Sequence, residues 1–255
     1  MKMENSITQG DFLDLLPKIE SGSVDAIITD PPYGTTKCKW DTEFSLPNMW
    51  TEFKRIIKPS GVIVSFAQPP FDKRLAMSNI EMFRYEWIWE KTQATGFLNV
   101  EKCPLKAHEN ILVFYSKQPT YNPQKTQGHS PVHTFTKRAS VQNKTELYGK
   151  TSDDITGGGD TSRFPRDVLK FKTDKQINKS NGFIHPTQKP LELMRYLVLT
   201  YTNRSDIVVD PFAGSGTTCV AAMQEDRRYI GFDREQKYVD LSKRRLDAAR
   251  DLFTT

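Results

Sequence analysis

The 255-residue chain has few cysteines and no long apolar segment. Its three cysteines, Cys38, Cys103 and Cys219, are odd in number and form no close pair, which argues against a disulfide framework and against a zinc site. No stretch approaches the roughly 20 apolar residues of a membrane-spanning helix. The opening sequence MKMENSITQGDF lacks the apolar core of a signal peptide. We therefore expect a cytoplasmic protein with reduced thiols.

Histidine is also scarce, with four residues in the chain. His129 and His133 have the i, i+4 spacing of a metal-binding pair, but Pro131 lies between them and no cysteine or acid completes the set. The sequence therefore predicts no metal site.

The net charge of +5 is concentrated in one segment. Residues 117–183 contain twelve basic and six acidic residues, so this segment carries +6 and the remainder about −1. The segment is rich in Thr, Ser, Asn, Gln, Gly and Lys and shows little hydrophobic periodicity. A long polar insertion within an α/β domain is usually functional or partly disordered, and clustered basic residues favour contact with a polyanion. A solvated, flexible insertion is the alternative.

The two flanks of this insertion alternate short apolar runs with amphipathic segments. We expect short strands, the third and fourth of which can pair antiparallel, at residues 24–28, 61–66, 86–91, 110–115, 207–210 and 229–233. Helices are expected from Pro190, from Thr217 and from Glu235, where apolar residues keep helical spacing. This alternation predicts a doubly wound, mostly parallel α/β sheet.

A dense motif, Asp30-Pro31-Pro32-Tyr33, directly follows the first of these strands. The two prolines cannot continue the strand because each lacks a backbone N–H and has a fixed φ. In open α/β sheets, ligands bind just beyond the carboxyl ends of the strands. The position of the motif therefore indicates a functional site.

A second motif begins where another strand ends, at Asp210. A loop containing Gly214 and Gly216 leads from it into a helix, so the backbone can approach a ligand closely. The loop lacks the lysine of a phosphate-binding P-loop and the third glycine of the dinucleotide fingerprint. A ligand with a nucleoside but no polyphosphate fits better. The later strand ends in Asp233, where a carboxylate can accept hydrogen bonds from ribose hydroxyls.

The order of Asp30-Pro31-Pro32-Tyr33, a basic insertion, HPTQKP (residues 185–190) and DPFAGSGTT (residues 210–218) resembles the DNA amino-methyltransferases of the permuted β class. The resemblance covers nearly the whole chain except the insertion. It implies a Rossmann-like methyltransferase sheet with a catalytic half (1–116), an inserted target-recognition region (117–183) and a cofactor-binding half (184–255). It further implies S-adenosylmethionine as cofactor and double-stranded DNA as substrate.

In this family the first motif would be catalytic. Accepting hydrogen bonds from both amino N–H groups of the target base, by the Asp30 carboxylate and the Pro31 carbonyl, would localise the nitrogen lone pair for attack on the methyl group. The prolines, Pro31 and Pro32, would hold this carbonyl rigidly. The base must leave the duplex to react, and Tyr33 is placed to stack on it. Packing of Tyr33 behind the strand is the alternative.

The resemblance also implies a cofactor site built from both ends of the chain. Phe212 would flank the adenine ring, Asp233 would bind the ribose, and Asp11 would meet the adenine amine unless it is only a helix cap. Lys189 and three threonines, Thr187, Thr217 and Thr218, are candidates to bind the methionine carboxylate. His185 can equally contact the ligand or have a structural role. The expected cofactor-binding residues are Asp11, Phe12, Asp30, Thr187, Lys189, Asp210, Phe212, Ala213, Gly214, Ser215, Gly216, Thr217, Thr218 and Asp233.

The basic segment supplies the predicted DNA contacts. The candidates are Lys137, Arg138, Arg163, Arg166, Lys170 and Lys172. The resemblance leaves open a homodimer and a cognate restriction endonuclease as partners.

Adenine N6 is the favoured target, because adenine enzymes of this family usually carry Asp where many cytosine-N4 enzymes carry Ser. Cytosine N4 stays open, as does methylation of an RNA or of a protein amide. A non-catalytic nucleic-acid-binding subunit is disfavoured by the intact Asp30, Tyr33 and Gly214. A cytosine-C5 enzyme would need a Pro-Cys nucleophile, whereas this chain has Cys103-Pro104 in the reverse order.

Overall fold

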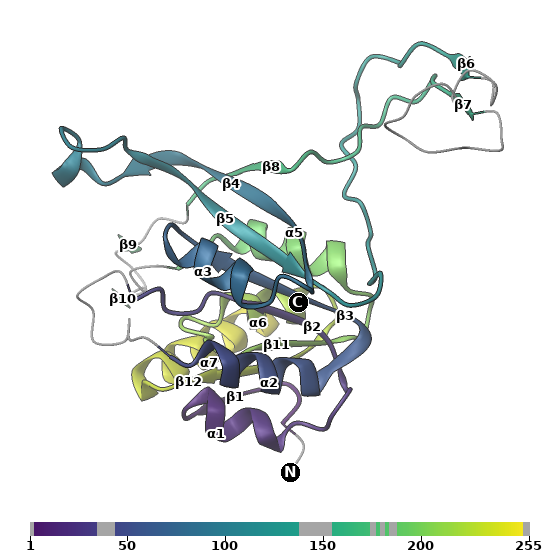
Figure 1. The fold of residues 1–255 in the computed structure, drawn as a ribbon. Coiled ribbons are helices and arrows are strands. Elements are labelled where there is room, and N and C mark those ends of the chain that lie inside the picture. Colours follow the sequence, from purple (N-terminus) through teal and green to yellow (C-terminus); the bar gives the residue numbers. More distant parts are fainter. Residues whose placement is uncertain are drawn as a thin grey trace. The chain divides into compact units, whose positions relative to one another are not determined.

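The computed structural model describes residues 3–34, 44–137, 155–173, 177–178, 182–183 and 188–251. The chain divides into two compact units, one formed by residues 1–122 and 167–255 and the other by residues 123–166. In the larger unit, helices cover both faces of one central sheet (Figure 1). The smaller unit lies within the predicted insertion.

The described residues of the larger unit form a central sheet of eight strands. In chain order the strands are β1 (Ser6–Gln9), β2 (Val24–Thr29), β3 (Ile57–Ala67), β4 (Phe83–Thr95), β5 (Lys106–Phe114), β8 (Val168–Phe171), β11 (Ile207–Asp210) and β12 (Arg228–Asp233). The helices are α1 (Phe12–Leu15), α2 (Leu46–Ile56), α3 (Phe71–Ser78), α5 (Leu191–Tyr201), α6 (Thr217–Gln224) and α7 (Gln236–Asp251), with short 3₁₀ turns η1 (Leu16–Lys18) and η2 (Phe97–Asn99). A separate two-stranded sheet pairs β9 (Ile177–Asn178) with β10 (Gly182–Phe183).

The strand order is β1-β12-β11-β2-β3-β5-β4-β8. Neighbours from β1 to β3 are parallel, β5 is antiparallel to both β3 and β4, and β8 is parallel to β4. The mostly parallel sheet and the antiparallel pair at residues 86–91 and 110–115 are thus confirmed. Because β2 and β11 are neighbours whose connections run to opposite faces of the sheet, their carboxyl ends form a topological switch point, the place where open α/β sheets have their ligand-binding crevice.

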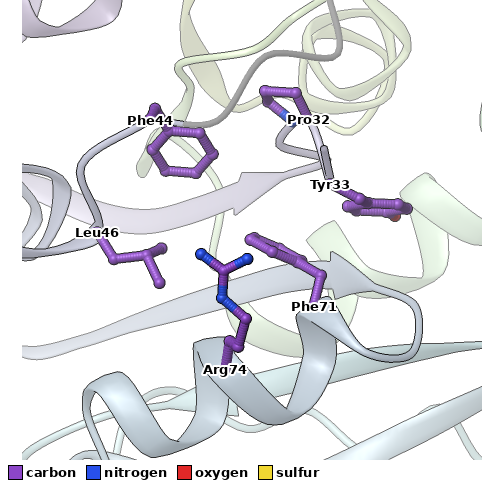
Figure 2. Close-up of a pocket in the computed structure, with 6 residues that line it drawn as sticks. All are labelled: Pro32, Tyr33, Phe44, Leu46, Phe71 and Arg74. Carbon is purple, nitrogen blue, oxygen red and sulfur yellow. The ribbon is translucent and has the colours of Figure 1, made fainter. Parts of the chain in front are cut away.

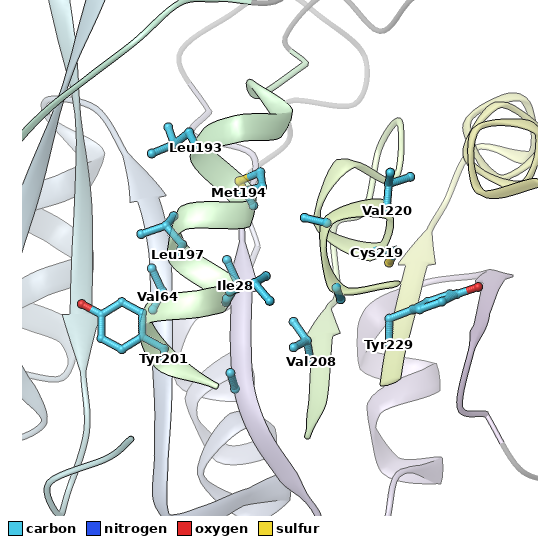
Figure 3. Close-up of a cluster of buried hydrophobic side chains, with 14 of the residues drawn as sticks. Ile28, Val64, Leu193, Met194, Leu197, Tyr201, Val208, Cys219, Val220 and Tyr229 are labelled. Atoms are coloured by element: carbon cyan, nitrogen blue, oxygen red, sulfur yellow. The ribbon is translucent and has the colours of Figure 1, made fainter. Parts of the chain in front are cut away.

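The core has two apolar layers, one on each face of the sheet. On one face α5, α6 and α7 cover the strands, with Leu193, Leu197 and Tyr201 following each other at helical spacing along α5 (Figure 3). On the other face α1, α2 and α3 cover them. Neighbouring residues of β2 contribute to different layers, Ile27 to one and Ile28 to the other, which explains the continuous apolar run of this strand.

The local sequence explains where the helices begin. Ser45 caps α2, because its hydroxyl accepts a hydrogen bond from the Asn48 backbone N–H at 3.3 Å. Pro190 was expected to be the first residue of α5, but it has extended backbone angles and serves as the N-cap, so the helix begins one residue later. None of the helices in the described ranges is long and apolar enough to cross a bilayer.

The smaller unit contains the two-stranded sheet of β6 (Phe135–Lys137) and β7 (Ile155–Gly157). The smaller unit covers fewer residues than the predicted insertion of residues 117–183. Part of that insertion, residues 168–171, forms β8 beside β4 in the central sheet. The sequence of β8, Val-Leu-Lys-Phe, is only four residues long and lies in a polar segment, so it gives little sign of its pairing with β4.

Candidate functional site

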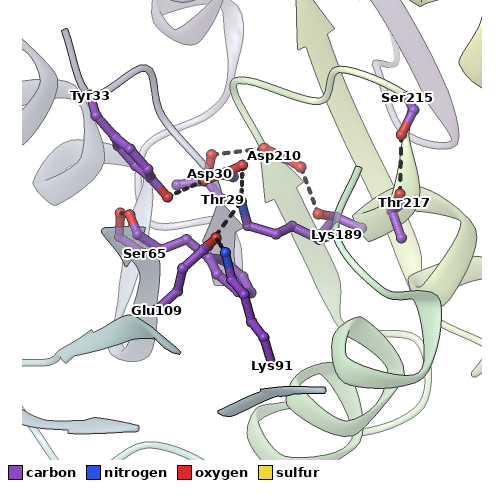
Figure 4. A network of polar contacts seen from close by, with 12 residues as sticks. Thr29, Asp30, Tyr33, Ser65, Lys91, Glu109, Lys189, Asp210, Ser215 and Thr217 are labelled. Atoms are coloured by element: carbon purple, nitrogen blue, oxygen red, sulfur yellow. Dashed lines mark hydrogen bonds and ion pairs between the residues drawn. The ribbon is translucent and has the colours of Figure 1, made fainter. Parts of the chain in front are cut away.

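Asp30 lies at the carboxyl end of β2, at the crevice beside β11. The Tyr33 hydroxyl donates a hydrogen bond to its Oδ1 at 2.6 Å, and Lys189 Nζ donates to its Oδ2 at 2.5 Å (Figure 4). Lys189 lies 159 residues further along the chain, just before α5. The first motif and the HPTQKP segment therefore meet at the Asp30 carboxylate.

The ion pairing continues beyond Lys189. Its Nζ lies 3.3 Å from Oε2 of Glu109 on β5, and Oε1 of Glu109 lies 2.5 Å from Nζ of Lys91 on β4. Neither Lys91 nor Glu109 was predicted from the sequence. The available signal was weak: both are charged residues next to apolar runs that were themselves expected to be strands, Glu109 before NILVFY and Lys91 at the end of EWIWEK.

The environment changes the pKa of Asp30, Lys189 and Glu109. Burial raises the pKa of Asp30, although the Lys189 ammonium opposes the change. Burial alone would lower the pKa of Lys189, but its pairs with Asp30 and Glu109 outweigh that and raise it. Burial would likewise raise the pKa of Glu109, yet Lys189 and Lys91 bring it below its usual value. Lys189 is therefore cationic and Glu109 anionic at neutral pH.

Asp210 closes the crevice from the side of β11. The hydroxyls of Thr29 and Thr218 donate to its two carboxylate oxygens at 2.7 and 2.6 Å, and the Phe212 N–H donates to Oδ1 at 3.1 Å. Burial raises the pKa of Asp210 to about 6. The carboxylate thus ties β2, the glycine loop and the first turn of α6 together.

The glycine loop joins β11 to α6 and is fixed to the end of β12. The Gly214 N–H donates to Oδ2 of Asp233 at 2.9 Å, and the Glu235 N–H donates to Oδ1 at 2.8 Å. Gly216 has φ +75°, and a Cβ there would lie 2.5 Å from Cβ of Ser242 on α7. The loop needs glycine at this position for both backbone conformation and space.

Side chains of the loop are also held from α7. Arg245 Nη1 donates to the carbonyl of Ser215 at 2.7 Å and to the hydroxyls of Ser215 and Thr217 at 2.9 Å. Ala213 is buried, and its N–H donates to the Phe232 carbonyl at 2.8 Å. The sequence did not predict Arg245, because its position on a helical face indicated packing.

Three phenylalanines gather next to the glycine loop. The ring centroids of Phe12 and Phe212 are 4.7 Å apart, and Phe44 lies 5.4 Å from Phe212. Asp11, just before Phe12, caps α1 by accepting a hydrogen bond from the Leu13 N–H at 2.9 Å, and its Oδ2 lies 3.0 Å from Arg234. The capping role considered for Asp11 is thus present.

A pocket open to solvent lies beside the first motif. Its lining residues are Pro32, Tyr33, Phe44, Leu46, Phe71 and Arg74. The rings of Tyr33 and Phe71 stack with centroids 5.4 Å apart, and the Arg74 guanidinium points from α3 toward the space beside them (Figure 2). The pocket therefore has an aromatic wall, one ring of which, Tyr33, donates a hydrogen bond to Asp30.

The predicted DNA contacts fall on both units. Lys137 ends β6 in the smaller unit, whose Arg163 donates hydrogen bonds to backbone carbonyls, including that of Ser162 at 2.9 Å. Lys170 lies on β8 in the larger unit and pairs with Glu90 at 2.8 Å. Two others, Arg166 and Lys172, are exposed. The remaining predictions, Arg138 and Thr187, lie outside the described residues, as does His185.

Comparisons with known proteins agree on one family. A family model for N6 and N4 methyltransferases, described as DNA methylase, matches residues 24–244. The chain is 31% identical over 271 residues to the type II methyltransferase M.BglII of Bacillus subtilis, covering 97% of this chain and 70% of the relative. It is 28% identical over 259 residues to the DNA adenine methyltransferase YhdJ of Escherichia coli K12, covering 96% of this chain and 83% of the relative.

Solved structures show the same fold. The M1.HpyAVI–SAM complex is 26% identical, with a TM-score of 0.63, and the match covers 94% of this chain and 99% of that one. The cytosine-N4-specific PvuII DNA methyltransferase is 18% identical, with a TM-score of 0.67, and the match covers 98% of this chain and 91% of that one. The second likeness concerns the fold alone.

Proposed function

This chain belongs to the family of N6 and N4 DNA methylases, and we propose that it methylates the N6 amino group of adenine in double-stranded DNA. The family makes it a DNA methyltransferase that uses S-adenosylmethionine as cofactor. The choice of adenine rests on Asp30, the carboxylate that begins its first motif at the crevice between β2 and β11.

The residues around the glycine loop fit a nucleoside-containing cofactor. Each oxygen of Asp233 accepts one backbone hydrogen bond, so lone pairs remain for the ribose hydroxyls. Phe12 and Phe212 offer aromatic surface for the adenine, and Gly214 and Gly216 have no Cβ atom to block a close approach to the loop backbone. When bound, S-adenosylmethionine supplies an electrophilic methyl group on its sulfonium sulfur.

Lys189 was predicted to meet the methionine carboxylate of the cofactor. Its short contacts with Asp30 and Glu109 favour a role beside the reacting nitrogen instead. Thr217 and Thr218 are buried and bonded to Arg245 and Asp210, so their contribution is to hold the loop in place.

The reaction needs hydrogen-bond acceptors at the target amine. The lone pair of an exocyclic amino nitrogen is delocalised into the ring, and two acceptors on its N–H groups favour the localised form. A carboxylate has about four acceptor positions, and Asp30 uses two of them for Tyr33 and Lys189. The free positions, together with the Pro31 carbonyl, can accept from the amine. Positioning and electrostatics then supply the catalysis without a covalent enzyme intermediate.

The target base must leave the duplex to reach Asp30. The pocket beside Tyr33 offers an aromatic wall on the same side of the crevice. Stacking of a base on an aromatic ring contributes about 1–3 kcal/mol, which offsets part of the cost of unstacking it. Tyr33 can therefore both orient Asp30 through its hydroxyl and receive the base on its ring.

Nucleoside analysis of DNA methylated in vitro with labelled cofactor tests the proposal. We expect N6-methyl-2′-deoxyadenosine as the labelled product. Labelled N4-methylcytosine would contradict the adenine assignment, which the family alone does not decide. Absence of label in DNA, with label in RNA or protein, would contradict the substrate class.

DNA binding should depend on the exposed basic residues of the predicted target-recognition region. Each phosphate contact steepens the dependence of log K on log salt by about 0.9 for duplex DNA. We expect Arg166→Ala and Lys172→Ala each to flatten this slope by about that amount. Lys243→Ala, an exposed change on α7, is the matched control and should leave the slope unchanged. Wild-type slopes for both test variants would show that these residues do not contact phosphate.

A further inference from the structure

We propose that Glu109 is a positioning residue for methyl transfer, which holds the Lys189 ammonium against Asp30 with the support of Lys91. The inference rests on the proposed function, because Asp30 matters here as the acceptor for the target amine. Neither Glu109 nor Lys91 belongs to the sequence motifs that identify the family.

Four charged groups alternate in sign from Lys91 on β4 to Asp30 at the carboxyl end of β2 (Figure 4). The nitrogen–oxygen distances are 2.5 Å for Lys91–Glu109, 3.3 Å for Glu109–Lys189 and 2.5 Å for Lys189–Asp30. They come from β4, from β5, from the position two residues before α5 and from the end of β2, so four separate parts of the fold converge. The charges sum to zero within the cluster.

The burial of the cluster indicates a purpose other than stability. The side chains of Lys91, Glu109 and Lys189 are 8%, 7% and 9% exposed, whereas that of Asp30 is 24% exposed. Buried ion pairs are often no more stabilising than apolar side chains of similar volume, because removing charges from water is costly. Only the last member, Asp30, reaches the crevice. The cluster therefore ends at the group that would meet the substrate.

Lys189 needs such support because its ammonium sits on a flexible four-carbon stem. The Phe66 ring lies 5.0 Å from its Nζ and gives no directional hold on the N–H groups. Glu109 places a negative charge 3.3 Å from this Nζ, in an ion pair that is not a hydrogen bond, and Lys91 in turn holds Glu109 at 2.5 Å. Among the described residues, loss of the Glu109 charge would leave Asp30 as the one remaining ion-pair partner of Lys189.

The charge of Glu109 also acts on Asp30 directly. The ionisable groups that face Asp30 are Tyr33, Lys189, Glu109 and, across the crevice, Asp210. Burial raises the pKa of Asp30, Lys189 lowers it and Glu109 raises it. Removing the negative charge of Glu109 should therefore lower the pKa of Asp30. Because the proposed acceptor is the ionised carboxylate, the rate should fall at low pH as Asp30 is protonated, and this acid limb of the rate profile should move to lower pH.

The test measures steady-state methyl transfer to duplex DNA as a function of pH for Glu109→Gln. We expect kcat to fall about tenfold, KM for DNA to change less than about threefold, and the acid limb to move to lower pH. Glu192→Gln, which removes an exposed ion pair with Arg195 on α5, is the matched control and should change none of these. Adding Lys91→Met to Glu109→Gln restores charge balance and should recover part of the lost rate.

Glu109→Asp covers the case in which the amide variant does not fold, since it keeps the charge on a shorter side chain. We expect it to lower kcat while the acid limb stays in place. A Glu109→Gln enzyme with wild-type rate and profile would overturn the inference, and so would a lower rate with an unmoved acid limb, which marks a merely structural role. Absence of DNA methylation by the wild-type protein would overturn the proposed function and the inference together.

Discussion

Replacing Asp30 with alanine is expected to abolish methyl transfer while largely preserving duplex binding. The change removes an acceptor at the target amine, and no other carboxylate within the described residues takes the same place next to Tyr33. Lys189 keeps its contact with Glu109, so the buried ammonium retains a counter-charge and the fold should survive. Because the basic residues of the insertion are untouched, affinity for DNA should change little.

The measurement is incorporation of labelled methyl groups into DNA, with duplex binding and thermal unfolding recorded on the same samples. Asp247→Ala is the matched control, because Asp247 is 70% exposed on α7 and far along the chain from the first motif. Some loss of cofactor affinity is compatible with the assigned role, since Asp30 lies at the crevice. Retention of more than about a tenth of the wild-type rate would show that another group accepts from the amine.

Replacing Gly216 with alanine should destabilise the protein and weaken cofactor binding together. The left-handed backbone of Gly216 costs a side-chain-bearing residue about 1–2 kcal/mol. The added Cβ would also lie 2.5 Å from Cβ of Ser242, and overpacking of this kind typically costs about 1–3 kcal/mol. We therefore expect the free energy of unfolding to fall by about 2–5 kcal/mol.

Gly22→Ala separates the two causes. Gly22 has a similar φ of +64°, but nothing lies within 4 Å of the Cβ that alanine would add. Its unfolding free energy should fall by only about 1–2 kcal/mol, with cofactor affinity unchanged. Urea denaturation and calorimetric titration with S-adenosylmethionine check both variants. Equal destabilisation by the two changes would mean that α7 moves away from the loop at little cost, and the packing argument would fail.

The sequence by itself determined the fold class and the two motifs. Short apolar runs that end in Asp30, Asp210 and Asp233 indicate buried parallel strands, and parallel strands bring their carboxyl ends to one edge. The glycines that follow Asp210 indicate a tight approach to a ligand, and Gly216 indeed has no room for a side chain. These features are local in the chain, so residue type and spacing are enough to predict them.

Some assignments needed the structure because one residue type serves several purposes. Asp11 was equally suited to a ligand contact and to a helix cap, and its bond to the Leu13 N–H shows the cap. Residues 168–171 appeared to belong to the polar insertion, yet they pair with β4. A segment of four residues is too short to show a periodicity of its own, so the neighbouring strand decides its structure.

The charged cluster at Asp30 was decided by tertiary structure alone. Its members are separated by long stretches of chain: Lys189 lies 159 residues from Asp30, and Glu109 lies on a strand whose antiparallel place between β3 and β4 sets which residues face the crevice. Sequence spacing carries no information about such contacts, because they depend on the order of strands in the sheet. The sequence therefore identified the carboxylate, and only the folded chain determined which charges surround it.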